Sequence, residues 1–439
     1  MILSGWGRYP KIDCVVVTPR SAPEAAATVR QADSLIARGN GRSYGDPAVN
    51  RRATMSMLQL DRMLAFDPQT GLLTCEAGVL LSDILTVFVP RGWFPVVTPG
   101  TRFVTVGGAI GSDVHGKNHH KDGSFGDHVQ SLDLLLADGR VVTCGPEREP
   151  ELFAATRGGM GLTGVILRAT IRLRPIETAC IRQETLRARD LGEIMELFEQ
   201  SDDWTYTVAW IDCLARGARL GRSLLYRGEH ALRDELPADR RASPLARPAR
   251  RTLTVPVDAP GGVLNRWTVS AFNELYFRSG RPGTAIVDID PFFYPLDSIL
   301  EWNRIYGRAG FTQYQCVLPK AVSEHGLRAL LNAIAASGAG SFLAVLKLFG
   351  QQDGLVSFPM EGYTLALDFP ATVPTLGFLN ELDAIVTDHG GRLYLAKDAR
   401  MAAGLLRRGY PGLPEFQRIR TAWNPAGTFQ SLQSERLAI

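Results

Sequence analysis

The sequence predicts an α+β fold in which two domains share a cleft, and three observations lead to this prediction. The chain has 439 residues, which is more than one hydrophobic core usually serves. Residues 13–175 alternate short β-branched or aliphatic runs with helical patterns. From about residue 176 glycine clusters are absent and longer alternating segments follow, as in an antiparallel sheet. We therefore expect domains at 1–175 and 176–391, and a last segment, 392–439, that returns to the first domain.

The first domain is expected to contain two hairpins with a helix between them. AFDPQTGLLTCEAG (65–78) turns around a proline and a glycine, and SLDLLLADGRVVTC (131–144) turns at Asp138-Gly139. LSDILTVFV (81–89) has a serine near its start and is followed by Pro90, which is typical of a helix.

The second domain is expected to be an antiparallel sheet that helices cover on one face. Alternating apolar residues indicate strands in TYTVAWIDC, FTQYQCVLP, SFLAVLKLF and YTLALDFP, and LGEIMELFEQ and SEHGLRALLNAIAAS are amphipathic helices. The Pro- and Arg-rich stretch at about 228–263 has little periodic apolar content. We expect a mobile loop there, which is either a solvated linker or a basic surface for phosphate or anionic lipid.

Composition excludes several classes of protein. The net charge of +3, with 21% charged residues, is far from the basic excess of a nucleic-acid-binding protein. The six cysteines are scattered without a CxxC pair, so neither a zinc site nor a disulfide framework is indicated, and a reducing compartment fits best. The N-terminus lacks a signal-peptide pattern, and no uncharged apolar stretch approaches about 18 residues. We expect a cytoplasmic protein without a membrane-spanning segment.

Glycine is the informative bias, because three clusters of it could let backbone approach a ligand closely. The first cluster, IARGNGRSYGD (36–46), follows a predicted strand, so its amide groups could surround a diphosphate. It is not a nucleoside-triphosphate loop, since no Gly-Lys-Ser/Thr follows. A purely structural turn is the other interpretation.

The second cluster, residues 98–129, has too few large apolar side chains to form a core element, so a bound ligand would have to fix its conformation. It holds four of the seven histidines: His115, His119, His120 and His128. We do not expect a metal site, because the residues between His115 and His119 make a poor helix and no carboxylate triad completes a ligand set.

The third cluster contains a literal GxGxxG at Gly159, Gly161 and Gly164. A dinucleotide fingerprint must follow a strand and open a helix. Here a helical pattern precedes the motif and the strand VILRATIRL follows it. We therefore expect tight packing or flavin contact rather than NAD binding.

In this order and spacing, RGNGRSYGD, PGTRFVTVGGAIGSDVHGKNHH, GSFGDHV and GGMGLTG resemble the FAD-binding domain of the vanillyl-alcohol oxidase (p-cresol methylhydroxylase, PCMH) superfamily. Within it the chain is most similar to the decaprenylphosphoryl-β-D-ribose 2′-oxidase family. That likeness runs from GWGRYP at Gly5 to the C-terminus and includes FYPLD, EWNRIYGRAGF, QYQ, KLFG, LDFP and GGRLYLAKDAR. The resemblance implies a two-subdomain PCMH-type FAD-binding domain and an antiparallel-sheet substrate-binding (cap) domain.

The resemblance also implies which residues contact FAD. Many relatives bond the flavin covalently to a His in the first loop, and Arg42 stands at that position here, so we expect non-covalent FAD. The implied contacts are Ile36, Ala37, Arg38, Gly39, Asn40, Gly41, Arg42, Ser43, Tyr44, Gly45, Asp46, Gly100, Thr105, Val106, Gly107, Gly108, Ser112, Asp113, Val114, His115, Ile166 and Tyr394.

Catalytic residues are implied in the same way. Lys397 is the first choice for the group that hydrogen-bonds the reacting hydroxyl, either as base or as donor, because burial beside flavin would lower its pKa. His115 and Gln315 complete the implied catalytic set. A surface lysine paired with Asp398 is the other interpretation of Lys397.

Substrate binding is implied at Lys117 and Lys347, which suit an anionic phosphate, and at Tyr294, Thr364 and Ala366. Two of these positions depart from the family. Ala366 stands where relatives commonly carry a Cys that covalent nitroaromatic inhibitors attack, a residue that hydride transfer does not require. Phe293 occupies the usual Tyr position before PLD, with Tyr294 beside it.

The implied activity is FAD-dependent oxidation of the 2-hydroxyl of a polyprenyl-phosphate-linked ribose to a 2-keto sugar. A partner reductase of the short-chain dehydrogenase type would complete an epimerisation toward the arabinose donor of cell-wall arabinan. A lipid-linked substrate also implies peripheral contact with the inner membrane. Two alternatives stay open: an aldonolactone- or alditol-type FAD sugar oxidase, and a non-catalytic flavin- or lipid-binding subunit.

Overall fold

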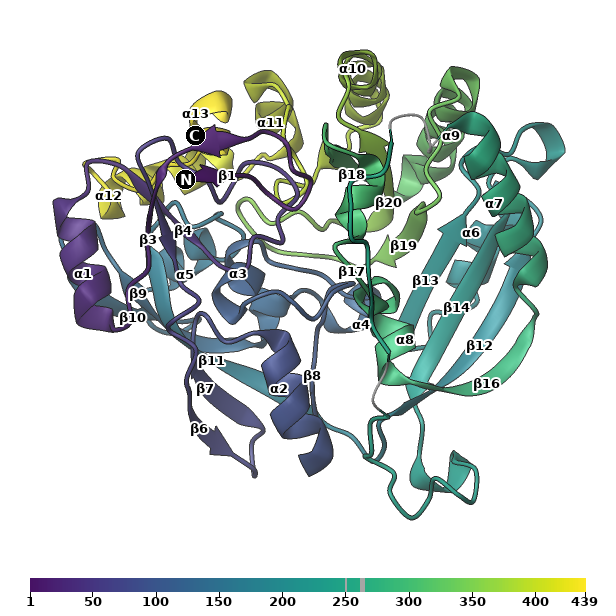
Figure 1. The fold of residues 1–439 in the computed structure, drawn as a ribbon, viewed down its shortest axis with the longest axis horizontal. Coiled ribbons are helices and arrows are strands. Elements are labelled where there is room, and N and C mark those ends of the chain that lie inside the picture. The colour runs from purple at the N-terminus through teal and green to yellow at the C-terminus, as the bar shows by residue number, and fades with distance from the viewer. Residues whose placement is uncertain (249–250, 261–264) are drawn as a thin grey trace.

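The computed structural model describes residues 1–248, 251–260 and 265–439, and its two halves are built on separate sheets (Figure 1). The first half, purple to blue in Figure 1, lies beside a second half of long teal and green strands. The two terminal segments meet on the first half, where Leu3, Ile12 and Leu432 pack together.

The first half has an antiparallel sheet of order β10-β9-β11-β7-β6, in which β8 also pairs with β11, and a parallel sheet of order β3-β5-β4. Its strands are β1 (Ile2–Leu3), β2 (Ile12–Asp13), β3 (Val15–Val17), β4 (Leu35–Arg38), β5 (Ala53–Ser56), β6 (Met63–Asp67), β7 (Leu72–Glu76), β8 (Trp93–Pro95), β9 (Val129–Leu135), β10 (Val141–Cys144) and β11 (Val165–Pro175). Both predicted hairpins are confirmed, as β6–β7 and β9–β10.

Short helices connect these strands, and the sequence marks where they start. The Ser21 side chain accepts a hydrogen bond from the amide of Glu24 at the start of α1, and Thr105 does the same for Gly108 at the start of α3. The helical segments are α1 (Ala22–Gln31), α2 (Leu81–Phe88), η1 (Val89–Arg91), α3 (Val106–Gly111), α4 (His119–Asp122), η2 (Phe125–His128) and α5 (Pro150–Thr156). The helix predicted at 81–89 is confirmed as α2.

The second half is an eight-stranded antiparallel sheet of order β16-β12-β14-β13-β19-β20-β18-β21, as the alternating segments predict. Its strands are β12 (Cys180–Ala188), β13 (Tyr206–Ile211), β14 (Ser223–His230), β16 (Gly283–Asp288), β18 (Phe311–Pro319), β19 (Val345–Phe349), β20 (Gly362–Pro370) and β21 (Arg392–Leu393). The strand expected at 341–349 is shorter than predicted, because the Ser341 hydroxyl bonds to the backbone of Leu343 and turns the chain before Val345.

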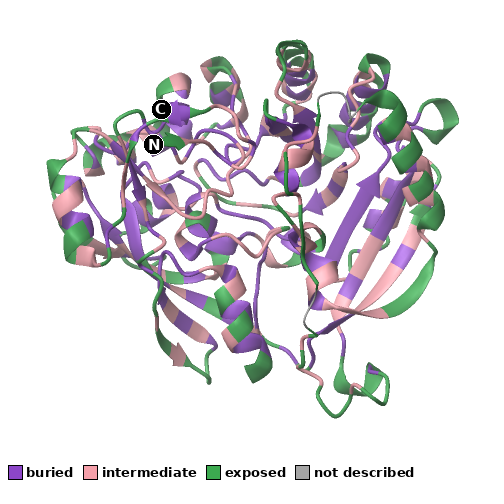
Figure 2. Cartoon of the chain, viewed as in Figure 1, coloured by how far each residue is buried: buried purple, intermediate pink, exposed green. Residues whose placement is uncertain are grey.

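Helices cover one face of this sheet, and Figure 2 shows their outer surfaces exposed, while the central strands are mostly buried and the edge strand β16 is partly exposed. The helical segments of this half are α6 (Leu191–Glu199), η3 (Gly217–Arg219), η4 (Arg233–Glu235), α7 (Arg266–Ser279), α8 (Ile289–Phe293), η5 (Pro295–Ser298), η6 (Trp302–Tyr306), η7 (Lys320–Val322), α9 (Ser323–Ser337) and α10 (Val373–Asp388). The C-terminal helices are α11 (Ala403–Gly409), α12 (Leu413–Trp423) and α13 (Leu432–Leu437). Beyond α12, Phe429 bridges to Leu35 of β4, so the last segment rejoins the first half.

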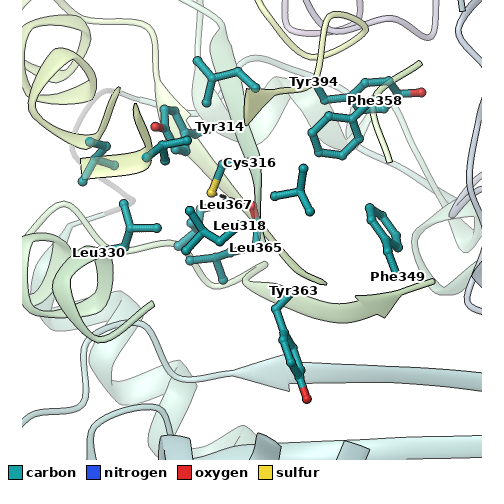
Figure 3. Close-up of a cluster of buried hydrophobic side chains, with 14 of the residues drawn as sticks. Tyr314, Cys316, Leu318, Leu330, Phe349, Phe358, Tyr363, Leu365, Leu367 and Tyr394 are labelled. Carbon is teal, nitrogen blue, oxygen red and sulfur yellow. Dashed lines mark hydrogen bonds between the residues drawn. The ribbon is translucent and has the colours of Figure 1, made fainter. Parts of the chain in front are cut away.

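The period of two along the strands separates the core from the opposite face of the sheet. Tyr314 and Cys316 of β18 point into the hydrophobic core with Leu365 and Leu367 of β20, and Leu330 of α9 packs over them (Figure 3). The intervening side chains of the same strands must therefore face away from α9. That second face lines the site described below.

The structure describes only part of the loop expected at 228–263, because residues 249–250 and 261–263 lie outside the described residues. Its first residues belong to β14, and β15 (Leu253–Thr254) pairs in parallel with β17 (Ile299–Leu300). Mobility of this segment stays a prediction. Among the described residues, no helix is both long and apolar enough to cross a bilayer.

Candidate active site

A cavity of about 760 Å³ lies between the glycine clusters of the first half and the open face of the second sheet. This volume is within the usual range for sites that hold small molecules and cofactors. Residues of the first half, many of them glycines, form one wall, and residues of β13, β18, β19 and β20 form much of the other.

The first glycine cluster forms a loop after β4 that only glycine could build. A Cβ atom on Gly39 would lie 2.1 Å from Oγ1 of Thr105, and one on Gly45 would lie 1.7 Å from the carbonyl oxygen of Asp398. Gly41 has a φ of +62°, in the left-handed region. The loop therefore packs backbone against α3 and the C-terminal segment, and several of its residues line the cavity.

Arg42, which the resemblance aligned with a flavin-linking His of many relatives, is held between two aromatic rings. Its guanidinium carbon lies 4.1 Å from the ring centre of Trp6 and 5.6 Å from that of Phe103. Arg38 also lines the cavity and donates hydrogen bonds to the carbonyl oxygens of Ser4 and Ala48. Two guanidinium groups beside glycine backbone suit a diphosphate.

The structure brings most of the predicted FAD contacts to the cavity and leaves five in the surrounding packing. Those that line the cavity are Ala37, Arg38, Gly39, Asn40, Gly41, Arg42, Ser43, Tyr44, Gly100, Thr105, Gly107, Gly108, Ser112, Val114, His115, Ile166 and Tyr394. Those that do not are Ile36, Gly45, Asp46, Val106 and Asp113.

Each of the five has a physical reason to lie behind the cavity wall. Ile36 and Val106 are fully buried in hydrophobic clusters, and Gly45 packs on Asp398. Asp46 pairs with Arg436 at 2.8 Å. Asp113 accepts hydrogen bonds from Ser124, Ser357 and the amide of Gly126. They support the wall.

Lys397, from the chain segment after β21, lies beside the glycine loop. Its ammonium nitrogen is 3.7 Å from the ring centre of Tyr44, and the side chain lines the cavity. Burial lowers the pKa of Lys397 to about 7, the charge of Asp368 acts against this, and Lys347 lowers the pKa further. Asp398 bonds instead to Arg436 at 2.8 Å, so the surface-pair interpretation of Lys397 is wrong.

Asp368 of β20 is a buried carboxyl behind Lys397. It accepts a hydrogen bond of 2.7 Å from Gln313 and one of 3.5 Å from Tyr306. Burial raises its pKa to about 7, and the hydrogen bond from Gln313 and the charge of Lys397 oppose the rise. Reasoning from the sequence missed this residue, although it stands two positions after Ala366 and so on the same face of the strand.

Two further lysines reach the same cavity. The ammonium group of Lys117 donates a hydrogen bond to the carbonyl oxygen of Phe292 and lies 4.2 Å above that residue's ring centre. Burial and the charge of Lys347 lower the pKa of Lys117 to about 7. Burial also lowers the pKa of Lys347 to about 8. An anion bound between them would favour their charged forms.

His115, Gln315 and Thr364 form a hydrogen-bonded chain along the cavity. The side-chain amide nitrogen of Gln315 is 3.0 Å from Nε2 of His115 and 3.2 Å from the hydroxyl of Thr364, which donates to the carbonyl of Cys316. An amide NH₂ can only donate, so Nε2 of His115 is the acceptor and its proton is on Nδ1. Both Gln315 hydrogens are used, which leaves its carbonyl oxygen for a ligand.

His115 is neutral, since burial first and then the charges of Lys347, His119 and Lys397 lower its pKa well below the ordinary value. Its Nδ1 has no hydrogen-bond partner within the described chain, as expected of a site that awaits a ligand. Tyr394, whose ring contacts His115, donates its hydroxyl hydrogen bond to the carbonyl of Ser112 at 2.9 Å.

Tyr294 is not brought to the cavity, unlike Thr364 and Ala366. Its hydroxyl hydrogen-bonds to that of Thr98 at 2.8 Å within the protein, and only 2% of the residue is exposed. Phe293, at the position where relatives carry Tyr, lines the cavity instead.

An aromatic lobe of the cavity was also missed. It is lined by Val208, Trp210, Tyr226, Phe272, Tyr276, Phe342 and Val345. The alternation within β13 and β19 could have identified Trp210 and Val345 as residues of the open face, whereas nothing in the sequence of α7 indicated that Phe272 and Tyr276 would face a cavity.

Comparison with known proteins extends over the whole chain. A family model described as an FAD binding domain matches residues 14–145. The chain is 41% identical to decaprenylphosphoryl-beta-D-ribose oxidase of Mycolicibacterium smegmatis, with 100% of this chain and 97% of that protein aligned. It is 37% identical to an uncharacterised protein of Streptomyces coelicolor, over 82% of this chain and all of the relative. L-gulonolactone oxidase of Mus musculus is 33% identical over 35% of this chain and 34% of its own length.

Proposed function

Because this chain belongs to the decaprenylphosphoryl-β-D-ribose oxidase family and is an FAD-dependent oxidoreductase, we propose that it oxidises the 2-hydroxyl of a polyprenyl-phosphate-linked ribose to a ketone. The observation that carries the proposal is Lys397, which lies against Tyr44 of the glycine loop and lines a cavity that two more lysines also line. FAD, when bound, supplies the acceptor for the two electrons of the C–H bond. Three features fit that cofactor: the glycine loop, the guanidinium groups of Arg38 and Arg42 beside it, and the Nδ1 of His115, which has no hydrogen-bond partner in the described chain.

Lys397 is placed to take the proton of the reacting hydroxyl. With a pKa of about 7, a large share of the amine is neutral at physiological pH and can accept a proton. The carbonyl oxygen of Gln315 is available to accept a hydrogen bond from the sugar, and His115 fixes the orientation of that amide. The sugar would thereby be held with one hydroxyl directed at Lys397.

Lys117 and Lys347 would bind the phosphate of the lipid carrier. Both would be cationic in the presence of an anion, and both line the cavity, Lys117 from the loop between α3 and α4 and Lys347 from β19. The Ala366 side chain offers no nucleophile, so an inhibitor that acts by bonding to a cysteine at this position would not inactivate the enzyme.

The keto sugar would be the substrate of a partner reductase that delivers hydride to the opposite face, which completes an epimerisation toward an arabinose donor for the cell wall. The six cysteines are all buried free thiols, which supports a reducing compartment such as the cytoplasm.

Incubation of the purified protein with polyprenylphosphoryl ribose and an artificial electron acceptor tests the proposal. The expected product has lost two hydrogen atoms and carries its carbonyl at C2, as mass spectrometry after borodeuteride trapping would show. Oxidation of a free aldonolactone or alditol in place of the lipid-linked sugar would contradict the proposal and favour a soluble sugar oxidase. Flavin binding without turnover of any of these substrates would favour a non-catalytic subunit.

A further inference from the structure

Large apolar side chains are exposed around the mouth of the cavity. Many of the exposed large hydrophobic residues of the described chain are scattered singly, as is usual on protein surfaces. Six belong to two regions that also contribute residues to the cavity lining, Trp267, Phe272 and Leu275 to α7 and Leu253, Val257 and Leu300 to the β15–β17 region. We call these six residues the mouth surface.

The mouth surface is continuous with the cavity. Phe272 of α7 is 40% exposed and Leu300 of β17 is 37% exposed, and both also line the cavity. The ring of Phe272 contacts that of Phe342, a residue of the aromatic lobe, at 5.7 Å between centres. An apolar path therefore leads from solvent into the site over these two residues.

The exposed face of α7 is not a sign of a loosely attached helix. Its inner side is fixed to the sheet by a hydrogen bond of 2.8 Å from Asn273 to Asp212 and by the ion pair between Glu274 and Arg222. Trp267 and Leu275 are eight residues apart and so share the outward face, where they are 80% and 69% exposed. Figure 2 shows this helix at the margin of the second half with much of its outer side exposed.

Positive charge accompanies the apolar residues. Arg266 begins α7, and Arg281 follows its end. Both are exposed, and neither has an ion-pair partner within the described ranges of the chain. Indole and aliphatic side chains flanked by free guanidinium groups are the composition of a surface that enters the headgroup region of an anionic bilayer.

We propose that the mouth surface docks the protein on an anionic membrane, so that the prenyl chain of the substrate passes from the bilayer between Phe272 and Leu300 into the cavity. Docking itself follows from the exposed residues, whereas the passage of a prenyl chain rests on the proposed function. A bilayer is favoured over a second copy of the chain because the path from the mouth surface is continuous with the aromatic lobe, and because Arg266 and Arg281 have no ion-pair partner among the described residues.

The test compares a double variant, Trp267→Ser with Leu275→Ser, with a control double variant, Leu64→Ser with Val373→Ser. The control residues are also exposed, at 43% and 85%, but lie on β6 and α10 away from the cavity lining. Neither pair lines the cavity, so flavin absorbance and turnover of a short-chain, water-soluble prenylphosphoryl ribose should match the wild type in both variants.

Flotation with vesicles of phosphatidylethanolamine and phosphatidylglycerol measures docking. The wild type and control should bind, and the Trp267/Leu275 variant should bind at least about tenfold more weakly, since two large apolar side chains no longer enter the bilayer. Its kcat/KM for long-chain substrate in the same vesicles should fall in parallel. The inference would be overturned if both double variants bound vesicles equally or if the wild type did not bind them. It would also be overturned if the sedimentation coefficient of the wild type differed from that of both variants, because that would reveal self-association. If vesicles are bound but no prenylphosphoryl ribose is oxidised, the proposed function fails and the docking surface stands.

Discussion

The two walls of the cavity are built in opposite ways. The glycine loop presents its backbone to the cavity. Glycine is required at Gly39 and Gly45 because a Cβ atom there would clash with neighbouring atoms. The sheet wall presents side chains, Lys347 from β19 and Gln315 from β18, whose partners lie far away in the sequence. On the function proposed above, the first wall would hold the cofactor by its shape, whereas the second would act on the substrate through its charged side chains. Substitutions on the two walls should therefore fail differently.

The sharpest contrast comes from Lys397→Met. If this amine accepts the hydroxyl proton, kcat should fall by about 10²- to 10⁴-fold while the flavin remains bound. Lys320→Met is the matched control, since Lys320 is paired with Glu199 away from the cavity. Steady-state turnover together with the flavin absorbance of the purified variants checks this. Unchanged kcat in Lys397→Met would remove the lysine from the chemistry.

Gly45→Ala should damage the other wall. The new methyl group would lie 1.7 Å from the carbonyl oxygen of Asp398, so the loop must move, at a cost of about 1–3 kcal/mol or more. Flavin content per protein and the denaturant midpoint should both fall. Gly404→Ala, where a Cβ meets nothing within 4 Å, should leave both unchanged. Full flavin occupancy in Gly45→Ala would show that the loop does not hold the cofactor.

Lys347→Met should affect binding more than the chemical step. Loss of a charge-assisted contact to the phosphate should raise KM by about ten- to a hundredfold, with kcat changed far less. Full kinetic curves with phosphorylated and phosphate-free prenyl sugars distinguish the cases, since only the phosphorylated substrate should be penalised. A selective loss of kcat would place Lys347 beside the reacting carbon instead.

The smallest effect is a displacement of the pH profile. Lys397 must be deprotonated to act as base, so kcat of the wild type should rise with pH through about 7. Since Lys117 and Lys347 must be protonated to bind phosphate, kcat/KM should fall again as the pH rises through about 7 and then about 8. In Asp368→Asn the carboxylate that raises the pKa of Lys397 is gone, so the acid-side midpoint of kcat should move to lower pH. A midpoint that stays in place would mean that Asp368 does not act through Lys397.

The sequence predicts the backbone wall well and the side-chain wall only in part. Glycine spacing after a strand marks the loop at 39–45 directly, because the constraint is local. Asp368 and Trp210 were missed because they join the site through strand register between segments far apart in the sequence. Tyr294 was assigned to the substrate from its motif, yet the backbone after α8 directs it to Thr98. Lys397 was found only because of a family resemblance, since nothing local distinguishes it from a surface lysine.

The most direct test of whether both walls serve one reaction is to mix the purified enzyme anaerobically with polyprenylphosphoryl ribose and to record the flavin absorbance. We predict that the oxidised flavin band bleaches in the wild type within the turnover time and that acid denaturation then releases the flavin from the polypeptide. A band that persists after mixing, in protein that carries its full flavin, would contradict the account.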